Sequence, residues 1–140
     1  MSGKGHKVRA LLEGVEAGPH NPHFAAYIRC FNEGEFYEAH DVLEALWLQD
    51  RNGPDGDFFK GLIQFAGGFV HLQQQRLRPA WKLFCLCTTY LARYPSLHLA
   101  LDVDNVLRLA KRWGEAAQTL GPECDLLAKW ELPKLEFQVL

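Results

Sequence analysis

Apolar residues recur every three or four positions in five successive segments of the chain, and runs rich in Pro, Gly, Asn and Asp separate these segments. This spacing places apolar side chains on one face of an α-helix. Short loops between successive helices favour antiparallel packing. The pattern therefore predicts an all-α fold, a single-domain antiparallel bundle of about five helices. The expected helices cover residues 22–31, 35–49, 57–75, 79–94 and 102–113.

The chain has 140 residues, of which 48% are hydrophobic, and this is enough for one domain with its own core. We divide it into an N-terminal tail (1–21), a helical bundle (22–120) and a C-terminal extension (121–140). In the extension, apolar residues alternate with polar ones after Pro133, which is typical of an extended segment. Such a segment docks on the bundle or on a partner chain, or it is a frayed terminus. Docking on a partner through Trp130 and the 135–139 segment would give a homodimer.

Overall charge and hydropathy exclude several classes of protein. The formal net charge is −2 and the isoelectric point is about 6.3, so we expect no nucleic-acid partner. Because no stretch approaches the ~18 to 20 continuous apolar residues of a membrane span, we expect no membrane partner either. The N-terminus lacks the apolar core and cleavage site of a secretory signal, which predicts a cytoplasmic protein. The remaining partners are a small-molecule substrate or another protein.

Charge is distributed unevenly along the chain. Residues 33–57 hold eight acidic residues and one basic residue, whereas residues 58–101 hold basic residues and no acid. We therefore expect an acidic helix at 35–49 beside longer basic helices, with carboxylates concentrated where a cation would be attracted.

Polar residues interrupt the apolar face of the 35–49 helix. At 100° per residue, His40 and Glu44 lie beside Trp47 and are flanked by apolar or aromatic side chains, including Tyr37. This position indicates a helix interface rather than the solvated face. Glu38 and Asp41 fall on a neighbouring, less apolar sector, and Glu38 lies 200° from His40.

Glycine and polar residues share one side of the 57–75 helix. Gly61, Gly67 and Gly68 lie on the side that also carries Gln64 and His71. A glycine inside a helix costs about 1 kcal/mol relative to alanine, and close approach of another helix would offset that cost. We expect the 35–49 helix to make this approach, so that His40 and Glu44 face Gln64 and His71.

Two interpretations of this polar cluster remain open. In the first, His40, Glu44 and His71 bind a divalent metal ion, Glu38 or Asp41 is the catalytic base, and Tyr37, Trp47 and Gln64 line the site. In the second, the same groups hydrogen-bond one another and fix the register of the two helices, within a non-catalytic bundle that binds a ligand or a protein. Spacing alone favours the second, since no HExxH motif is present.

Three blocks of sequence resemble a known family. They are FNEGEFYEAHDVLE (31–44) with Trp47 one turn on, GLIQ (61–64) followed by His71, and YPS (94–96) leading to LDV (101–103). Together they are similar to the domain-of-unknown-function 309 family over about residues 22–113. The resemblance implies a small, all-helical, mostly cytosolic protein from a family labelled as predicted metal-dependent hydrolases. The family's polar motif falls on Glu38, His40, Asp41, Glu44, Gln64 and His71. Lys60 departs from the family pattern, which usually has Gln at that position.

Overall fold

The computed structural model describes residues 3–121 and 125–139. Within these ranges the chain forms seven α-helices and one short β-hairpin, which confirms the all-α class. The elements are α1 (Gly3–Leu12), α2 (Pro22–Asn32), α3 (Phe36–Gln49), α4 (Gly56–Gln73), α5 (Leu77–Leu91), β1 (Leu97–His98), β2 (Leu101–Asp102), α6 (Val103–Thr119) and α7 (Leu126–Lys129).

The five helices expected from the apolar spacing are α2 to α6. Two of them begin at a side-chain cap that the sequence indicates. The Asn21 side chain accepts a hydrogen bond from the His23 backbone N–H at 2.8 Å, and Asp102 accepts one from Asn105 at 3.0 Å. These caps satisfy N–H groups that the first turn of a helix leaves unpaired, and so they fix where α2 and α6 start.

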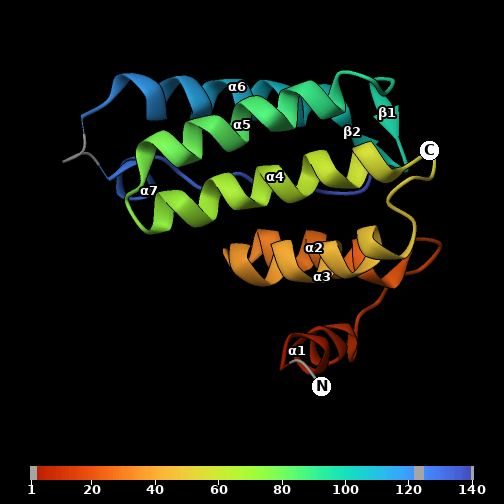
Figure 1. Cartoon of the computed structure of the whole chain (residues 1–140). Helices are drawn as coiled ribbons and strands as arrows, with labels where there is room; N and C mark the ends of the chain where they lie inside the picture. Colours follow the sequence, from red (N-terminus) through yellow and green to blue (C-terminus); the bar gives the residue numbers. More distant parts are fainter. Residues whose placement is uncertain (1–2, 122–124, 140) are drawn as a thin grey trace.

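The helices are arranged in layers around α4 (Figure 1). Helix α4 packs against α3 on one side and α5 on the other, α6 packs against α5, and α2 packs against α3. The colours of Figure 1 show that α4, α5 and α6 run in alternating directions. Helix α1 lies against α2 and α3, at the edge of the molecule opposite α5 and α6.

The glycines of α4 face α5 more than α3. The prediction that the 35–49 helix, α3, packs against them is therefore wrong for two of the three. A Cβ atom added at Gly68 would lie 2.6 Å from the Phe84 ring, and one at Gly61 would lie 2.9 Å from Leu91. At Gly67 the nearest atoms belong to Leu83, at 2.8 Å, and to His40, at 3.9 Å. Helix α4 is central and contacts both neighbours. The close approach of α5 is what requires glycine, without a side chain, at these positions.

Aromatic rings connect the helices in the core. Phe69 of α4 has ring-centroid distances of 5.4 Å to Phe31 of α2, 4.9 Å to Phe36 of α3, 5.1 Å to Phe84 of α5 and 5.0 Å to Trp113 of α6. Such separations are favourable for aromatic pairs. One buried phenyl group therefore contacts every other long helix of the bundle.

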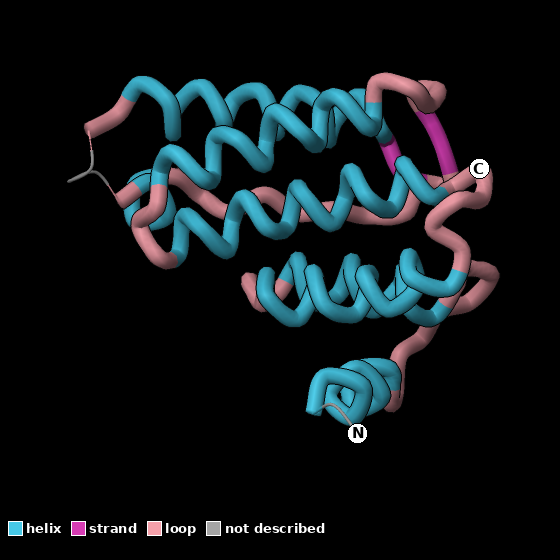
Figure 2. The backbone as a smooth tube through the Cα atoms, viewed as in Figure 1, coloured by secondary structure: helices cyan, strands magenta, loops and turns pink. Residues whose placement is uncertain are grey.

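The C-terminal extension contains α7 and then docks on the bundle as an extended segment (Figure 2). Leu135 is 2% exposed, Phe137 forms an antiparallel bridge with Leu101, and the Gln138 N–H donates to the Ala100 carbonyl at 2.7 Å. Docking on the bundle is thus confirmed for this segment, and fraying is wrong for it. Ala100 lies in the β1–β2 turn, a hairpin that the apolar spacing did not predict.

The aromatic side chains that suggested a homodimer pack against other residues of the same chain. Trp130 packs edge-on against Trp113 with centroids 5.0 Å apart, and Phe137 stacks on His20 at 3.6 Å. Val139, in contrast, is 98% exposed. The homodimer stays a prediction, but most of the surface that motivated it is covered by the chain itself.

The N-terminal segment 1–21 was expected to be a tail, and the structure places a helix, α1, in it. Val8 of α1 is buried, and the Arg29 guanidinium of α2 donates to the Leu11 carbonyl at 2.5 Å. Tertiary contacts of this kind position α1. None of the helices in the described parts of the chain has the length and apolar content needed to cross a membrane.

Candidate functional site

The polar cluster begins on α3, where Phe36, Ala39, Val42 and Leu43 are buried and His40 lies at the edge of that face. The His40 Nδ1 atom is 3.1 Å from a carboxylate oxygen of Asp41, whose side chain is almost entirely buried. Because a carboxylate only accepts hydrogen bonds, Nδ1 of His40 is the donor in this contact.

Glu44 approaches the other ring nitrogen of His40. Its Oε2 atom lies 4.0 Å from Nε2, and the side chains of His40 and Glu44 are 31% and 25% exposed. Both nitrogens of the imidazole therefore face carboxylates of the same helix. Glu38 is half-buried in the first turn of α3, on a different face from His40.

Helix α4 contributes Gln64, Gly67 and His71, at successive turns of one face. Gly67 faces the His40 ring across the space of one side chain, since a Cβ atom there would be in van der Waals contact with His40 Cδ2, at 3.9 Å. His71 is half-buried, and its Nδ1 atom is buried without a hydrogen-bond partner. Burial, and secondarily the positive charge of Arg76, lowers the pKa of His71, which keeps its imidazole neutral at physiological pH.

Two aromatic residues border the cluster. The Tyr37 side chain is 54% exposed, with its ring centroid 6.5 Å from that of His40. The Lys60 ammonium lies 4.4 Å from the centroid of the half-buried Trp47 ring, within the range of a cation–π interaction. The Lys60 ammonium thus lies over the ring of Trp47, next to the cluster.

The predicted metal ligands are not grouped as a metal site. Throughout residues 3–121 and 125–139, no three His, Cys, Asp or Glu side chains are close enough together to hold one ion. His40 and Glu44 form a pair on α3, while His71 belongs to the facing helix. The donor set does not fit the expected three-ligand site with these side-chain positions. The arrangement does connect His40 to Asp41 and Glu44 of its own helix, beside Gly67 of α4.

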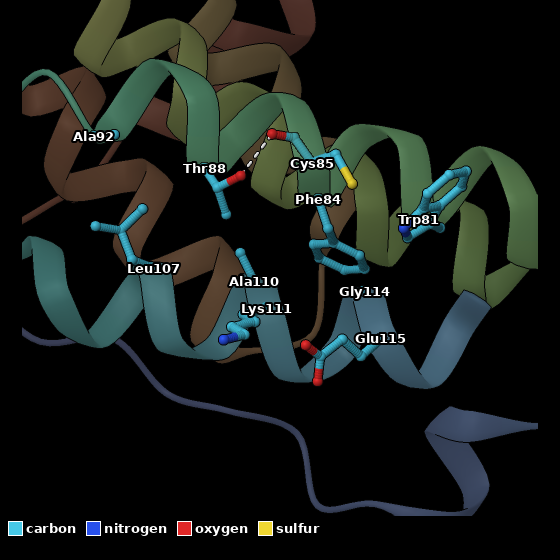
Figure 3. A pocket seen from close by; sticks show the side chains of 10 residues that line it. All are labelled: Trp81, Phe84, Cys85, Thr88, Ala92, Leu107, Ala110, Lys111, Gly114 and Glu115. Atoms are coloured by element: carbon cyan, nitrogen blue, oxygen red, sulfur yellow. Dashed lines mark hydrogen bonds between the residues drawn. The ribbon is translucent and has the colours of Figure 1, made fainter. Parts of the chain in front are cut away.

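A second candidate site is a groove between α5 and α6, which the sequence reasoning missed. The α5–α6 groove has two parts that meet at Trp81, with volumes of about 420 Å³ and 530 Å³. The first part is drawn in Figure 3, where Trp81 and Ala92 mark its two ends. Its lining comes from both helices, namely Trp81, Phe84, Cys85, Thr88, Ala92, Leu107, Ala110, Lys111, Gly114 and Glu115.

The first part of the α5–α6 groove is mainly apolar. The Thr88 hydroxyl donates to the Cys85 carbonyl at 2.7 Å, so its proton is used within α5 and its oxygen can still accept a hydrogen bond (Figure 3). Gly114 allows α6 to approach Phe84, because a Cβ atom there would lie 3.1 Å from Phe84 Cβ. The helical stripes that form this lining are visible in the sequence, but apolar stripes also line a core. Periodicity alone therefore assigned them to the interior.

Comparison with known families supports the resemblance seen in the sequence. Residues 24–83 match the family described as Domain of unknown function (DUF309). The match supports the resemblance seen in the sequence, over 60 of the 140 residues and thus over a shorter range than expected. It includes most of α2, all of α3 and α4, and the first half of α5. No curated protein matches the chain. The polar cluster lies wholly inside the DUF309 segment, whereas the α5–α6 groove extends beyond it into α6.

Proposed function

We propose that this chain is a ligand-binding helical bundle whose ligand occupies the α5–α6 groove. The observation that carries the proposal is the hollow itself. It has an apolar lining and a volume of about 420 Å³, within the range of roughly 300–1,000 Å³ that is usual for small-molecule sites. Phe84, Leu107 and Ala110 supply apolar contact, and Thr88, Lys111 and Glu115 supply a few polar groups.

In this proposal the polar cluster around His40 is a structural lock. A buried carboxylate needs a hydrogen-bond donor, and His40 supplies one to Asp41 at 3.1 Å. The imidazole also lies beside Gly67 of α4, where an added Cβ atom would be 3.9 Å from His40 Cδ2. These contacts support a role in holding α3 on α4. Ligand binding and the lock are then separate properties located on opposite sides of α4.

Calorimetric titration with 2-naphthylethanol, a neutral two-ring probe, tests binding in the groove. We expect saturable binding to one site, abolished by Thr88→Phe because the added ring fills the lining. Thr89→Phe is the matched control: both hydroxyls donate to the Cys85 carbonyl, but Thr89 is not part of the lining. Equal binding by both variants and the unaltered protein would place the probe elsewhere and refute the proposal.

A second candidate function is divalent-cation binding by His40, Glu44 and His71, as the hydrolase label of the family implies. The unpaired, buried Nδ1 atom of His71 favours it, because such atoms normally have a partner. Side chains would have to move to bring three donors together. The test is elemental analysis of untagged protein purified without chelator, with His40→Ala as the comparison. Stoichiometric metal that is lost in the variant supports this candidate, whereas metal-free protein whose melting temperature falls in the variant supports the lock.

A further inference from the structure

The two helices that form the α5–α6 groove are basic, although the chain as a whole is acidic. Helices α5 and α6 contain five basic residues and two acidic ones, whereas the whole chain has a net charge of −2. The basic residues are Arg78, Lys82, Arg108, Lys111 and Arg112, and the acidic ones are Asp104 and Glu115. An anion near this face therefore meets a favourable local field.

Cations also line the groove itself. Lys111 lines the apolar part, and Arg78 lines the part on the other side of Trp81. None of the ion pairs between described residues involves Lys111 or Arg78. Glu115 is the acid in the lining, and it is exposed to solvent one turn from Lys111. Both cations therefore remain available to a bound ligand.

The opposite side of the bundle has the opposite charge. Helix α3 contains Glu38, Asp41 and Glu44 and no Lys or Arg, and α4 separates it from α5. Charges more than about 8–10 Å apart are largely screened at physiological salt, so the carboxylates of α3 do not cancel the local field at the groove. The groove would thus attract a negatively charged ligand, and the polar cluster a positively charged one.

We propose that the α5–α6 groove binds an apolar small molecule that carries one carboxylate. The apolar body lies against Phe84, Leu107 and Ala110, and the carboxylate lies toward Lys111 or, across Trp81, toward Arg78. This inference rests on the proposed function, and it adds the charge and the chemical class of the ligand. A body the size of two fused rings fits the volume of about 420 Å³.

Three probes with the same apolar body test the inference by calorimetric titration: 2-naphthylacetate, 2-naphthylethanol and 2-naphthylethylammonium. We expect the acetate to bind about fivefold more tightly than the alcohol, as a solvent-exposed ion pair would give, and the ammonium to bind more weakly than both. Raising the salt concentration to 0.5 M should remove most of the difference, since it screens the charges.

Substitution of Lys111 locates the charge effect. In Lys111→Gln, we expect acetate affinity to fall about threefold to fivefold more than affinity for the alcohol. The control is Arg51→Gln, an exposed position in the α3–α4 loop outside the groove, which should leave both affinities as they are. Thr88→Phe should abolish acetate binding.

The outcomes separate this inference from the proposed function. Equal affinity for the three probes, with binding lost in Thr88→Phe, would overturn the anion inference and leave the ligand-binding proposal standing. No binding of any probe would overturn both. Unchanged acetate affinity in both Lys111→Gln and Arg78→Gln would also overturn the anion inference, because it would show that neither groove cation holds the carboxylate.

Discussion

His40 and His71 show what helical spacing reveals about a residue and what it leaves out. The spacing correctly placed both side chains at the edges of apolar helix faces, where each is half-buried. It did not indicate that His40 would hydrogen-bond to Asp41, its neighbour in the chain, because that contact depends on side-chain rotamers. Nor did it indicate that His71 Nδ1 would remain without a partner.

Titration of His71 gives a prediction about stability and pH. Burial lowers the pKa of His71 below its usual value of about 6.5, so the unfolded chain takes up this proton more readily than the folded one. The free energy of unfolding should therefore fall as the pH decreases through about 6.5 and below. Urea unfolding between pH 5 and pH 8 should show a shallower dependence in His71→Gln.

His23 provides the comparison for this measurement, because burial lowers its pKa as well. His23→Gln should therefore remove a separate part of the pH dependence, and the double variant should remove more than either single variant. An identical pH dependence in the original protein and in His71→Gln would show that His71 is not held neutral by the fold.

At the scale of elements, sequence reasoning located α2 to α6 and missed α1. The five long helices carry apolar stripes that are sufficient to identify them. Helix α1, with the sequence GKGHKVRALL, has glycines and basic residues and a weak apolar stripe. Contacts such as the buried Val8 position it, and contacts between elements are not visible in local periodicity. The same limit explains why the glycines of α4 were assigned to the wrong neighbour.

Adjacent glycines of α4 give a matched test of how closely each one packs against α5. In Gly68→Ala, the new Cβ atom would lie 2.6 Å from the buried Phe84 ring, so we expect a loss of about 1–3 kcal/mol in the free energy of unfolding. In Gly67→Ala, the nearest atom is the end of a Leu83 side chain that can move, and alanine stabilises a helix by up to about 1 kcal/mol. Chemical denaturation should therefore show a clear loss for Gly68→Ala alone. Equal losses would contradict the distinction between the buried Phe84 ring beside Gly68 and the movable Leu83 side chain beside Gly67.

The last residue of α2 holds the C-terminal extension in place. The Asn32 side-chain amide donates to the Leu135 carbonyl at 2.6 Å and accepts from the Leu135 N–H at 2.7 Å. Leu135 is buried, so Asn32→Ala leaves both of its backbone groups without these partners and should cost about 1–3 kcal/mol. Hydrogen exchange at the Leu135 amide should become faster.

Gln73→Ala is the control for Asn32→Ala. The Gln73 side chain donates one exposed hydrogen bond to the Gly34 carbonyl, at 3.1 Å, so its loss should change stability little. Unaltered exchange at Leu135 in Asn32→Ala would mean that the extension is held by its apolar contacts alone.

For the whole molecule, the sequence predicted the fold class and located the polar cluster, but it did not reveal the groove. The groove lies between the apolar faces of α5 and α6 where these two helices meet at the surface. Its presence therefore depends on how α5 and α6 pack. The uneven charge was visible in the sequence, and the structure distributes it to the two sides of α4. The two candidate sites consequently lie on opposite sides of the central helix, and each has a tryptophan beside it: Trp47 at the polar cluster and Trp81 in the groove.

These two tryptophans allow one measurement to test the central claim that the α5–α6 groove is the ligand site. In a ¹H–¹⁵N correlation spectrum, each indole N–H gives its own signal, and 2-naphthylacetate can be titrated into the full-length protein. We expect the Trp81 signal to move progressively to saturation while the Trp47 signal stays in place. Movement of the Trp47 signal with Trp81 unchanged would contradict this expectation and would move the site to the polar cluster around His40.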